Sequence, residues 1–238
     1  DKRVYSFTLK KKVRFHTITQ NGLLTANQGR EVTANDVKYS YERLLNPDTN
    51  SPNASLLHVI QGSDQFIKGE SDQVSGIKII DSHRLEIHLK NPFSPFLWIL
   101  ATHSLSIVPW EDVRRWGTAF HEHPVGSGPF IYERTTKSTL NESPFEGSME
   151  LRSNLDFHRG RPYLDKLKFL FIQQENVSYS LFERHAFFHM DRIPPEHLRN
   201  ALRNKSYGFQ ERTSLEISYL GMNLEIAPFD NLHVRKAL

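Results

Sequence analysis

The 238-residue chain contains no cysteine, which excludes disulfide bonds and thiolate chemistry. It also lacks any apolar run that approaches the about 18 to 20 residues of a membrane-spanning helix. No basic segment followed by an apolar one, the pattern of a secretory signal peptide, opens the sequence. The compartment stays open on these grounds, because cysteine-free chains occur both inside and outside cells.

The chain has little excess charge of either sign. Lysine and arginine total 30, aspartate and glutamate total 27, and the formal net charge is +3. The only basic run, 10–12, lies in a strand-like stretch and indicates a solvated strand end. This balance is not the basic surface of a nucleic-acid-binding protein, so we expect no nucleic-acid partner. A hydrophobic fraction of 38% with 16 phenylalanines suffices for a core and argues against a disordered chain.

Strands and helices are both predicted, in irregular order. Alternating apolar residues predict one or two strands over 3–15 and a hairpin at 74–89. Thr33 and Asp36 have the spacing of a capping box, so a helix should follow them and end at Asn46 and Pro47. The further predicted elements are a buried helix at 96–101, strands at 130–133, 149–152 and 166–172, and helices at 176–188 and 195–202. This mixture indicates an α/β (mixed α+β) fold in one or two domains.

Twelve histidines raise the question of a metal or catalytic site. His121 and His123 would share one face of an extended segment, and His185 and His189 are spaced by one helical turn. Neither pair has a third ligand at a recognisable spacing, and no nucleophile elbow, phosphate loop or dinucleotide fingerprint occurs. We therefore expect no enzyme activity, no catalytic residue, no metal site and no cofactor. A metallohydrolase that uses the histidines is the alternative, and a metal analysis would decide it.

Residues 123–130, HPVGSGPF, hold two of the 12 glycines and two of the 12 prolines of the chain. A surface loop is the plain explanation. The alternative is a backbone crossing between two bodies of the protein, with Gly126 and Gly128 permitting close approach or unusual φ. Pro129 would then hold the entry of the following strand rigid. The motif by itself favours the loop.

Short motifs in a fixed order extend along nearly the whole chain. They are VYSFTL (4–9) with VRFH (13–16), EVTANDV (31–37) with YSY (39–41), VSGI (74–77) with LKNP (89–92), PVGSGPF (124–130), YLD (163–165), and YLGMN (219–223) with PFDN (228–231). In this order they resemble the extracellular solute-binding proteins of family 5, the oligopeptide-, dipeptide- and nickel-binding components of ABC importers. The fourth motif is similar to the family's PVGTGPY signature, with Ser127 and Phe130 as conservative departures.

The resemblance implies a periplasmic-binding-protein-like class II fold of which this chain is a part. Residues 1–122 would form the small second α+β domain, with 1–16 alternatively entering from the first lobe. Residues 123–238 would be a truncated part of the first lobe, and the opposite lobe would be absent. The glycine-proline segment would then return the chain from the small domain to the first lobe, with Gly126, Gly128 and Pro129 at the crossing. The strand-like start and the interrupted helical pattern at 234–238 also predict an excised piece of a longer protein.

The resemblance also implies residues that contact ligand. Asn223, which follows Gly221 and Met222, would face the ligand, and its amide can both donate to and accept from a peptide backbone. Ser51 and Asn53 lie in a stretch that would reach the cleft from the second domain. The alternatives are a satisfied core amide or a turn residue for Asn223, and a helix-capping loop for Ser51 and Asn53.

Three segments depart from the family pattern. Residues 17–30 stand where the family has a very short turn, and their polarity predicts a mobile, solvent-exposed excursion. Residues 137–148 are longer and less regular than usual. Residues 185–188, HAFF, replace a family turn, so the backbone must turn differently there or pack more heavily.

The expected function is capture of a peptide or similar solute between two lobes and its delivery to an ABC permease at the membrane. The protein would be extracellular, either periplasmic or membrane-anchored, and would act as a monomer. The alternative is the solute-sensing domain of a helix-turn-helix transcription regulator with the same fold, which would be cytoplasmic. No helix-turn-helix is visible in the chain, and the sequence before residue 1 would separate the two.

Overall fold

A computed structural model describes residues 2–20, 23–137, 146–211 and 219–237. The chain divides into two compact units, Asp1–Gln174 and Glu175–Leu238. The boundary at residue 174 follows from contacts within the chain, whereas the boundary proposed from the sequence lies at 122.

The first sheet of unit 1 contains β1 (Val4–Thr8), β4 (Ile77–Asp81) and β5 (Arg84–His88) in the order β1-β5-β4. All pairs are antiparallel, and the predicted hairpin is confirmed by the pairing of Ile77 with Ile87. Along β5, Leu85 and Ile87 are buried while their neighbours are more exposed, which is the alternation of a half-buried strand. Because β1 pairs along the whole of β5, residues 4–8 belong to the same sheet as the hairpin.

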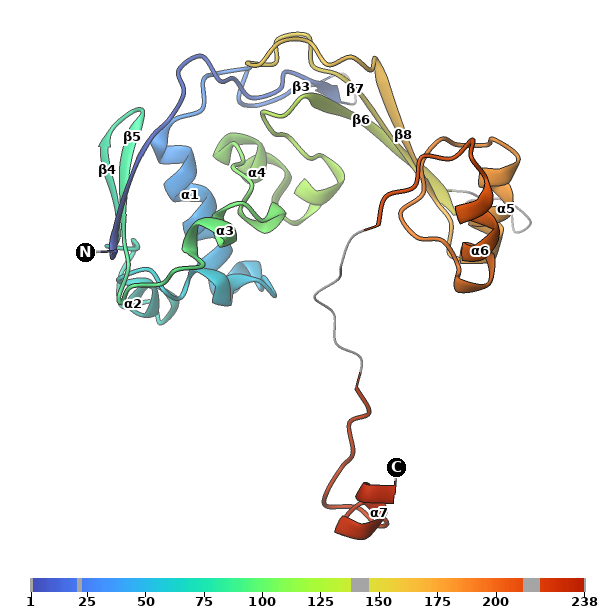
Figure 1. Ribbon diagram of the computed structural model, residues 1–238. Coiled ribbons are helices and arrows are strands. Elements are labelled where there is room, and N and C mark those ends of the chain that lie inside the picture. Colours follow the sequence, from blue (N-terminus) through green and yellow to red (C-terminus); the bar gives the residue numbers. More distant parts are fainter. Residues whose placement is uncertain (1, 21–22, 138–145, 212–218, 238) are drawn as a thin grey trace. The chain divides into compact units, whose positions relative to one another are not determined.

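Helix α1 (Ala34–Leu45) packs against β4 and supplies one side of the main core (Figure 1). The predicted capping box is confirmed at its start, where the Thr33 N–H donates to the Asp36 carboxylate at 2.8 Å. The helix ends at Asn46, as Pro47 requires. The buried apolar residues of this core are Ala34, Val37, Tyr41, Leu44, Leu45, Leu57, Ile60, Val74, Ile77, Leu85, Ile87, Leu89, Phe96 and Leu105.

Short helices close the remaining sides of this core. They are η1 (Pro47–Thr49), η2 (Ala54–Leu57), α2 (Ser63–Ile67), α3 (Phe96–Leu100) and η3 (His103–Leu105). The prediction of a buried helix at 96–101 is correct for Phe96, which is fully buried, but wrong for Leu97 and Trp98, which are 53% and 81% exposed. A helix of five residues presents only one side to the core, so an all-apolar sequence cannot bury every side chain.

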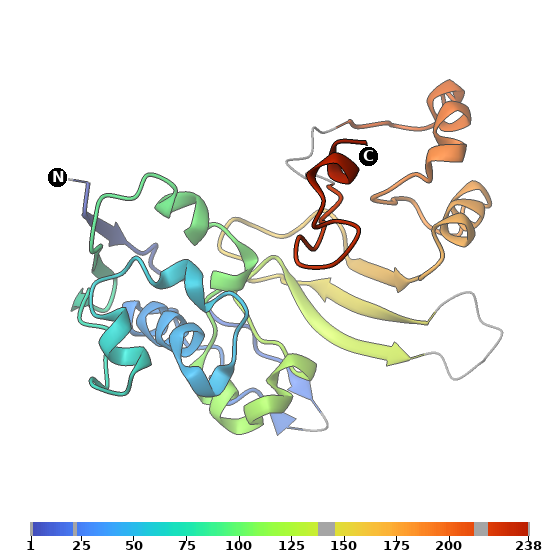
Figure 2. The same ribbon diagram turned by 90° about the horizontal axis from the view of Figure 1, so that it is seen from below.

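The second sheet of unit 1 contains β6 (Phe130–Lys137), β7 (Gly147–Ser153) and β8 (Lys166–Phe171), side by side and antiparallel (Figure 2). The three predicted strands are thereby confirmed. Two helices, α4 (Trp110–Trp116) and η4 (Gly117–Glu122), precede this sheet, and β2 (Thr19–Gln20) pairs with β3 (Leu23–Leu24). Of the irregular segment predicted at 137–148, residues 138–145 lie outside the described residues.

Unit 2 contains α5 (Glu175–Glu183), α6 (Pro195–Arg203) and α7 (Leu232–Ala237). Buried Tyr179 of α5 stacks on His197 of α6, with ring centroids 4.2 Å apart. The predicted helix at 176–188 ends at residue 183, and His185 takes a φ of 59° just after it. The backbone thus turns differently at HAFF, as expected, whereas heavier packing is absent at Phe188, which is exposed.

Candidate functional site

The glycine-proline segment joins η4 to β6 and lies beside residue 16, which is more than one hundred positions earlier in the chain. The His16 N–H donates to the Gly126 carbonyl at 2.7 Å, and the His16 ring Nε2 lies 2.9 Å from the Gly128 carbonyl. On the other side, the Asn154 amide donates to the same Gly128 carbonyl at 3.0 Å. The segment therefore bridges the chain that follows β1 and the end of β7.

Neither close backbone approach nor an unusual φ explains the glycines at positions 126 and 128. Neither has a positive φ, and a Cβ added to Gly128 would meet no atom within 4 Å. At Gly126 the nearest atom to such a Cβ is a ring carbon of His16 at 4.0 Å. The contacts at this crossing are made by the carbonyl oxygens of the segment. The Pro129 carbonyl, for example, accepts from the Asn154 N–H at 2.8 Å.

His16 is itself a buried polar residue, only 6% exposed. Burial lowers the pKa of its imidazole below 6.5, and the nearby Arg152 lowers it further, while the bond to Gly128 acts in the opposite direction. Together these effects favour the neutral form of the imidazole. Because a carbonyl only accepts, the proton must reside on Nε2, which donates to Gly128.

Most of the residues between 17 and 30 whose burial is described are at least half-buried, and the prediction of a solvent-exposed excursion is wrong for them. Thr25 and Asn27 are 5% and 3% exposed, and Ile18 is buried, although Leu24 and Gln28 remain exposed. Residues 21–22 lie outside the described residues. The polarity that suggests exposure is instead satisfied internally.

Asp112 of α4 is the internal partner. Its carboxylate accepts from the Ala26 N–H at 2.7 Å, from the Asn27 N–H at 3.1 Å and from the Asn27 side chain at 2.6 Å. The same Asn27 amide lies 3.3 Å from the His16 carbonyl. A fully buried carboxylate needs such donors, and the polar turn supplies them.

Arg30 ties the end of this segment to both neighbouring helices. Its guanidinium bonds the Asp36 carboxylate of α1 at 2.6 Å and 2.8 Å, and it also pairs with Glu111 of α4. These two carboxylates raise the pKa of Arg30 above its usual range. The position of Glu111 and Asp112 after Pro109 predicts the acidic first turn of a helix, and this is confirmed in α4. The hydrogen bonds of Glu111 and Asp112 to residues 26–30 cannot be predicted from the acidic first turn alone.

The predicted ligand-contacting residues of unit 1 lie in the loop before η2. Ser51 and Asn53 are half-buried, and the Ser51 hydroxyl accepts from the Asn53 N–H at 3.3 Å. The Asn53 side chain makes no cap hydrogen bond to η2. The hydrogen bond from the Asn53 N–H to the Ser51 hydroxyl forms a turn before η2, which fits the capping-loop alternative. Ligand contact by Ser51 and Asn53 stays a prediction.

The predicted ligand-contacting residues of unit 2 are Gly221, Met222 and Asn223. Asn223 is exposed, and its Oδ1 accepts from the Glu225 N–H at 3.0 Å, so it forms a local turn. This exposure does not fit the core-amide alternative, and the contact with Glu225 fits the turn alternative. Gly221 is exposed and Met222 half-buried, in a stretch with no strand pairing. A ligand role for these residues stays a prediction.

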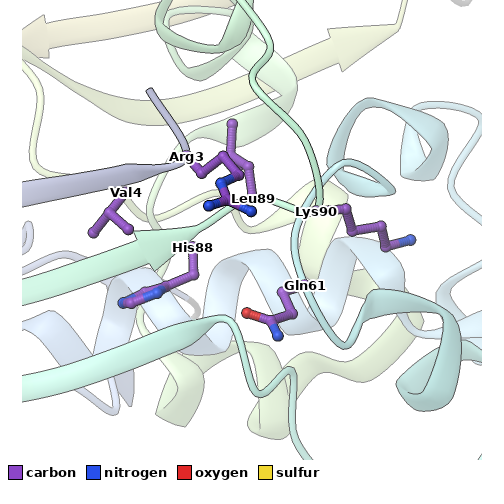
Figure 3. A pocket seen from close by; sticks show the side chains of 6 residues that line it. All are labelled: Arg3, Val4, Gln61, His88, Leu89 and Lys90. Atoms are coloured by element: carbon purple, nitrogen blue, oxygen red, sulfur yellow. The ribbon is translucent and has the colours of Figure 1, made fainter. Parts of the chain in front are cut away.

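Two surface pockets of unit 1 were not predicted. One, of about 250 Å³, is lined by Arg3, Val4, Gln61, His88, Leu89 and Lys90 (Figure 3). The other, of about 330 Å³, is lined by His58, Val59, Lys90, Asn91, Pro92 and Phe93. Two polar side chains at the first pocket already have partners, Lys90 with Asp64 at 2.7 Å and His88 with Glu86 at 3.0 Å. The first pocket combines residues of three separate chain segments and the second combines residues of two, so the motifs VYSFTL and LKNP, which contribute Val4 and residues 89–92, do not by themselves indicate a pocket.

The histidine pairs have separate partners. The His121 Nδ1 faces the Thr118 carbonyl at 2.8 Å, His123 stacks on Trp116, and His189 pairs with Asp191. Within the described ranges, no group of three or more His, Asp or Glu side chains could hold a metal ion. Over the same ranges, no helix has the length and apolar character needed to cross a bilayer.

Comparison with solved structures defines the class. The chain superposes on the murein tripeptide-binding protein MppA of Escherichia coli with a TM-score of 0.70 and 24% identity, over 86% of this chain and 38% of that one. An oligopeptide-binding protein of Borrelia burgdorferi, OppAIV, gives a TM-score of 0.72 and 24% identity, over 99% of this chain and 44% of that one. The mixed α/β fold is thus a part of the periplasmic-binding-protein-like fold, as the sequence predicts.

Comparison of sequences then identifies the family. The profile of "Bacterial extracellular solute-binding proteins, family 5 Middle" matches residues 1–238, and the chain belongs to this family. It is 26% identical to di/tripeptide-binding protein 2 of Pseudomonas aeruginosa (strain UCBPP-PA14), over 100% of this chain and 43% of that relative. It is also 26% identical to the dipeptide-binding protein of Escherichia coli (strain K12), over 100% of this chain and 42% of that relative. The chain therefore spans about two fifths of the length of these curated relatives.

Proposed function

We propose that this chain is part of a solute-binding protein that captures a peptide between two lobes and delivers it to an ABC permease. Residues 1–122 would be the small domain and 123–238 a part of the first lobe. Gly126, Gly128 and Pro129 would lie at the crossing between them. The protein would act as an extracellular monomer without catalytic activity. Family membership and the peptide-binding names of its relatives support this proposal.

The observation that carries the proposal is the pairing of two distant chain segments at the crossing. Residue 16 and residues 126–128 run side by side, joined by two hydrogen bonds. Such a pairing of distant segments is what a connection between the small domain and the first lobe requires. Peptide capture then needs edge backbone groups and polar side chains such as Asn223, Ser51 and Asn53.

Native mass spectrometry of the whole protein, purified without added ligand, tests the proposal. A co-purifying mass that is released on collisional activation and sequenced as a peptide is the expected result. A release that contains only non-peptide solutes would contradict the peptide assignment. A protein that neither carries a ligand nor binds any member of a defined library of di- to pentapeptides would contradict solute capture itself.

A further inference from the structure

We propose that His16 is the positioning residue of the crossing, and that its ring holds the sheet β6-β7-β8 in a defined orientation to the sheet β1-β5-β4. The inference rests on the proposed crossing at Gly126, Gly128 and Pro129 and adds the side chain that sets its geometry. Both sheets and His16 lie in unit 1.

The evidence begins with the bonds of His16 itself. Its N–H reaches the Gly126 carbonyl and its Nε2–H reaches the Gly128 carbonyl, so one residue spans three residues of the second segment. The Gly128 carbonyl also accepts from Asn154, directly after β7. Of the two bonds from His16, only the one from its ring to the Gly128 carbonyl depends on the side chain. A substitution of His16 can therefore remove that bond while the backbone bond to Gly126 remains.

The other side of His16 is anchored in the small domain. Its carbonyl lies within hydrogen-bond distance of Asn27 and of the Thr25 hydroxyl, at 3.3 Å each. Asn27 in turn is held by the buried Asp112 of α4. The result is a continuous series of polar contacts from α4 through Asn27 and His16 to Gly128. Buried contacts of this kind permit few alternative geometries, because each broken bond leaves an unsatisfied group.

A second link between the two parts is weaker. Lys10 Nζ lies 3.3 Å from the His158 carbonyl, but this contact is exposed to solvent. Exposed contacts of long side chains contribute little to a fixed geometry. The bridge at His16 is therefore the stronger polar determinant of orientation, and it acts beside the apolar packing of Ile131 on β6 against Ile18 and Val125.

Protonation should weaken the bridge. Burial disfavours the charged ring more than the bond to Gly128 favours it, and Arg152 on β7 repels it, so a protonated His16 should leave its buried position more readily. The carboxylate of Asp112 does not compensate, because its contacts are made to Asn27 and Ala26. The orientation of the two sheets should therefore broaden as the pH falls below 6.5, the ordinary histidine value.

The absence of cysteine makes a direct distance measurement possible in the whole 238-residue chain. Cysteines introduced at exposed Lys78 on β4 and exposed Lys168 on β8 would carry nitroxide labels for pulsed electron resonance. At pH 7.5 we expect one narrow distance distribution for the parent chain. His16→Ala should at least double its width, whereas His16→Gln, whose amide can donate to Gly128, should restore most of it. His121→Ala is the matched control, because that exposed ring contacts the nearby Thr118 and Glu122 and not the bridge.

The pH series keeps the test decisive even if His16→Ala does not fold. The parent chain should broaden between pH 7.5 and pH 5, and His16→Gln should not. Equal broadening in both chains would overturn the proposal, as would an unchanged distribution in a folded His16→Ala chain. No ligand is used, so these outcomes are independent of whether the whole protein binds a peptide.

Discussion

The ring Nε2 of His16 lies 2.9 Å from the carbonyl oxygen of Gly128, 112 residues further along the chain. This contact joins the segment after β1 to the segment before β6, at the place where the chain passes from one sheet to the other. The stretch HPVGSGPF is therefore more than a loop between two elements, since its carbonyl groups are acceptors for residues 16 and 154. The first two predictions concern this buried contact and the residues that support it.

The pH dependence of stability should reveal the buried His16. Its pKa is lowered in the folded chain from 6.5, so between the folded value and 6.5 the unfolded chain binds more protons. The contribution of His16 is thus fully present above about pH 6.5 and is lost as the pH falls through that window. Urea unfolding between pH 5 and pH 8 should show a smaller decline for His16→Gln than for the parent chain. Parallel curves would mean that His16 is not the titrating group.

Removal of the Asn27 side chain should destabilise the fold. Asn27→Ala takes one donor from the buried Asp112 and one from the His16 carbonyl. Leaving such groups unsatisfied costs about 1–3 kcal/mol, measured as a shift of the urea midpoint at constant slope. Asn91→Ala is the control, because Asn91 is exposed, and it should change the midpoint little. Equal shifts in the two variants would show that the Asp112 contact does not matter for stability.

Limited trypsin digestion should spare the segment 25–30. Arg30 is held by Asp36 and Glu111, and its neighbours Thr25 and Asn27 are buried. Cleavage after Arg30 should therefore be much slower than cleavage after the exposed Lys11, which serves as the internal standard. Mass spectrometry of timed samples gives both rates. Early cleavage after Arg30 would restore the view of an exposed excursion.

The chain by itself should bind peptides weakly. It spans about two fifths of its relatives' length, and a ligand held between two lobes loses much of its burial when one is incomplete. Titration calorimetry with a defined peptide library should give no dissociation constant at or below the micromolar range. The whole protein is the positive control. Micromolar or tighter binding by the 238-residue chain would place the complete site within it.

Asn223→Ala in the whole protein should weaken peptide binding without unfolding the protein. Loss of one or two bonds to a buried ligand costs about 1–3 kcal/mol, or roughly 5- to 150-fold in affinity. Asn231→Ala is a matched control, since its Oδ1 accepts from the His233 N–H as that of Asn223 accepts from Glu225. The affinity should fall only in the first variant, and the urea midpoint should change little in both. An unchanged affinity for Asn223→Ala would remove this residue from the binding site.

The sequence by itself determined those features of the protein that depend on local interactions. The capping box of Thr33 and Asp36, the stop at Asn46 and the hairpin around residue 82 all depend on neighbours within a few positions. The order of motifs was also sufficient to identify the family. Even so, the length of α5 and the exposure of Trp98 could not be read from local patterns, because both depend on which neighbours are near.

Tertiary structure alone decided how the polar residues between 16 and 31 are used. Their composition is that of a solvated loop, and only the buried carboxylate of Asp112, 85 residues from Asn27, turns them inward. The same holds at the crossing, where the glycines suggest freedom of the backbone but the carbonyl groups of Gly126 and Gly128 serve as acceptors for His16. A sequence pattern records what a residue prefers among its neighbours in the chain. A buried polar group is satisfied by whichever partner the fold brings within about 3 Å, and that partner lies at no fixed spacing.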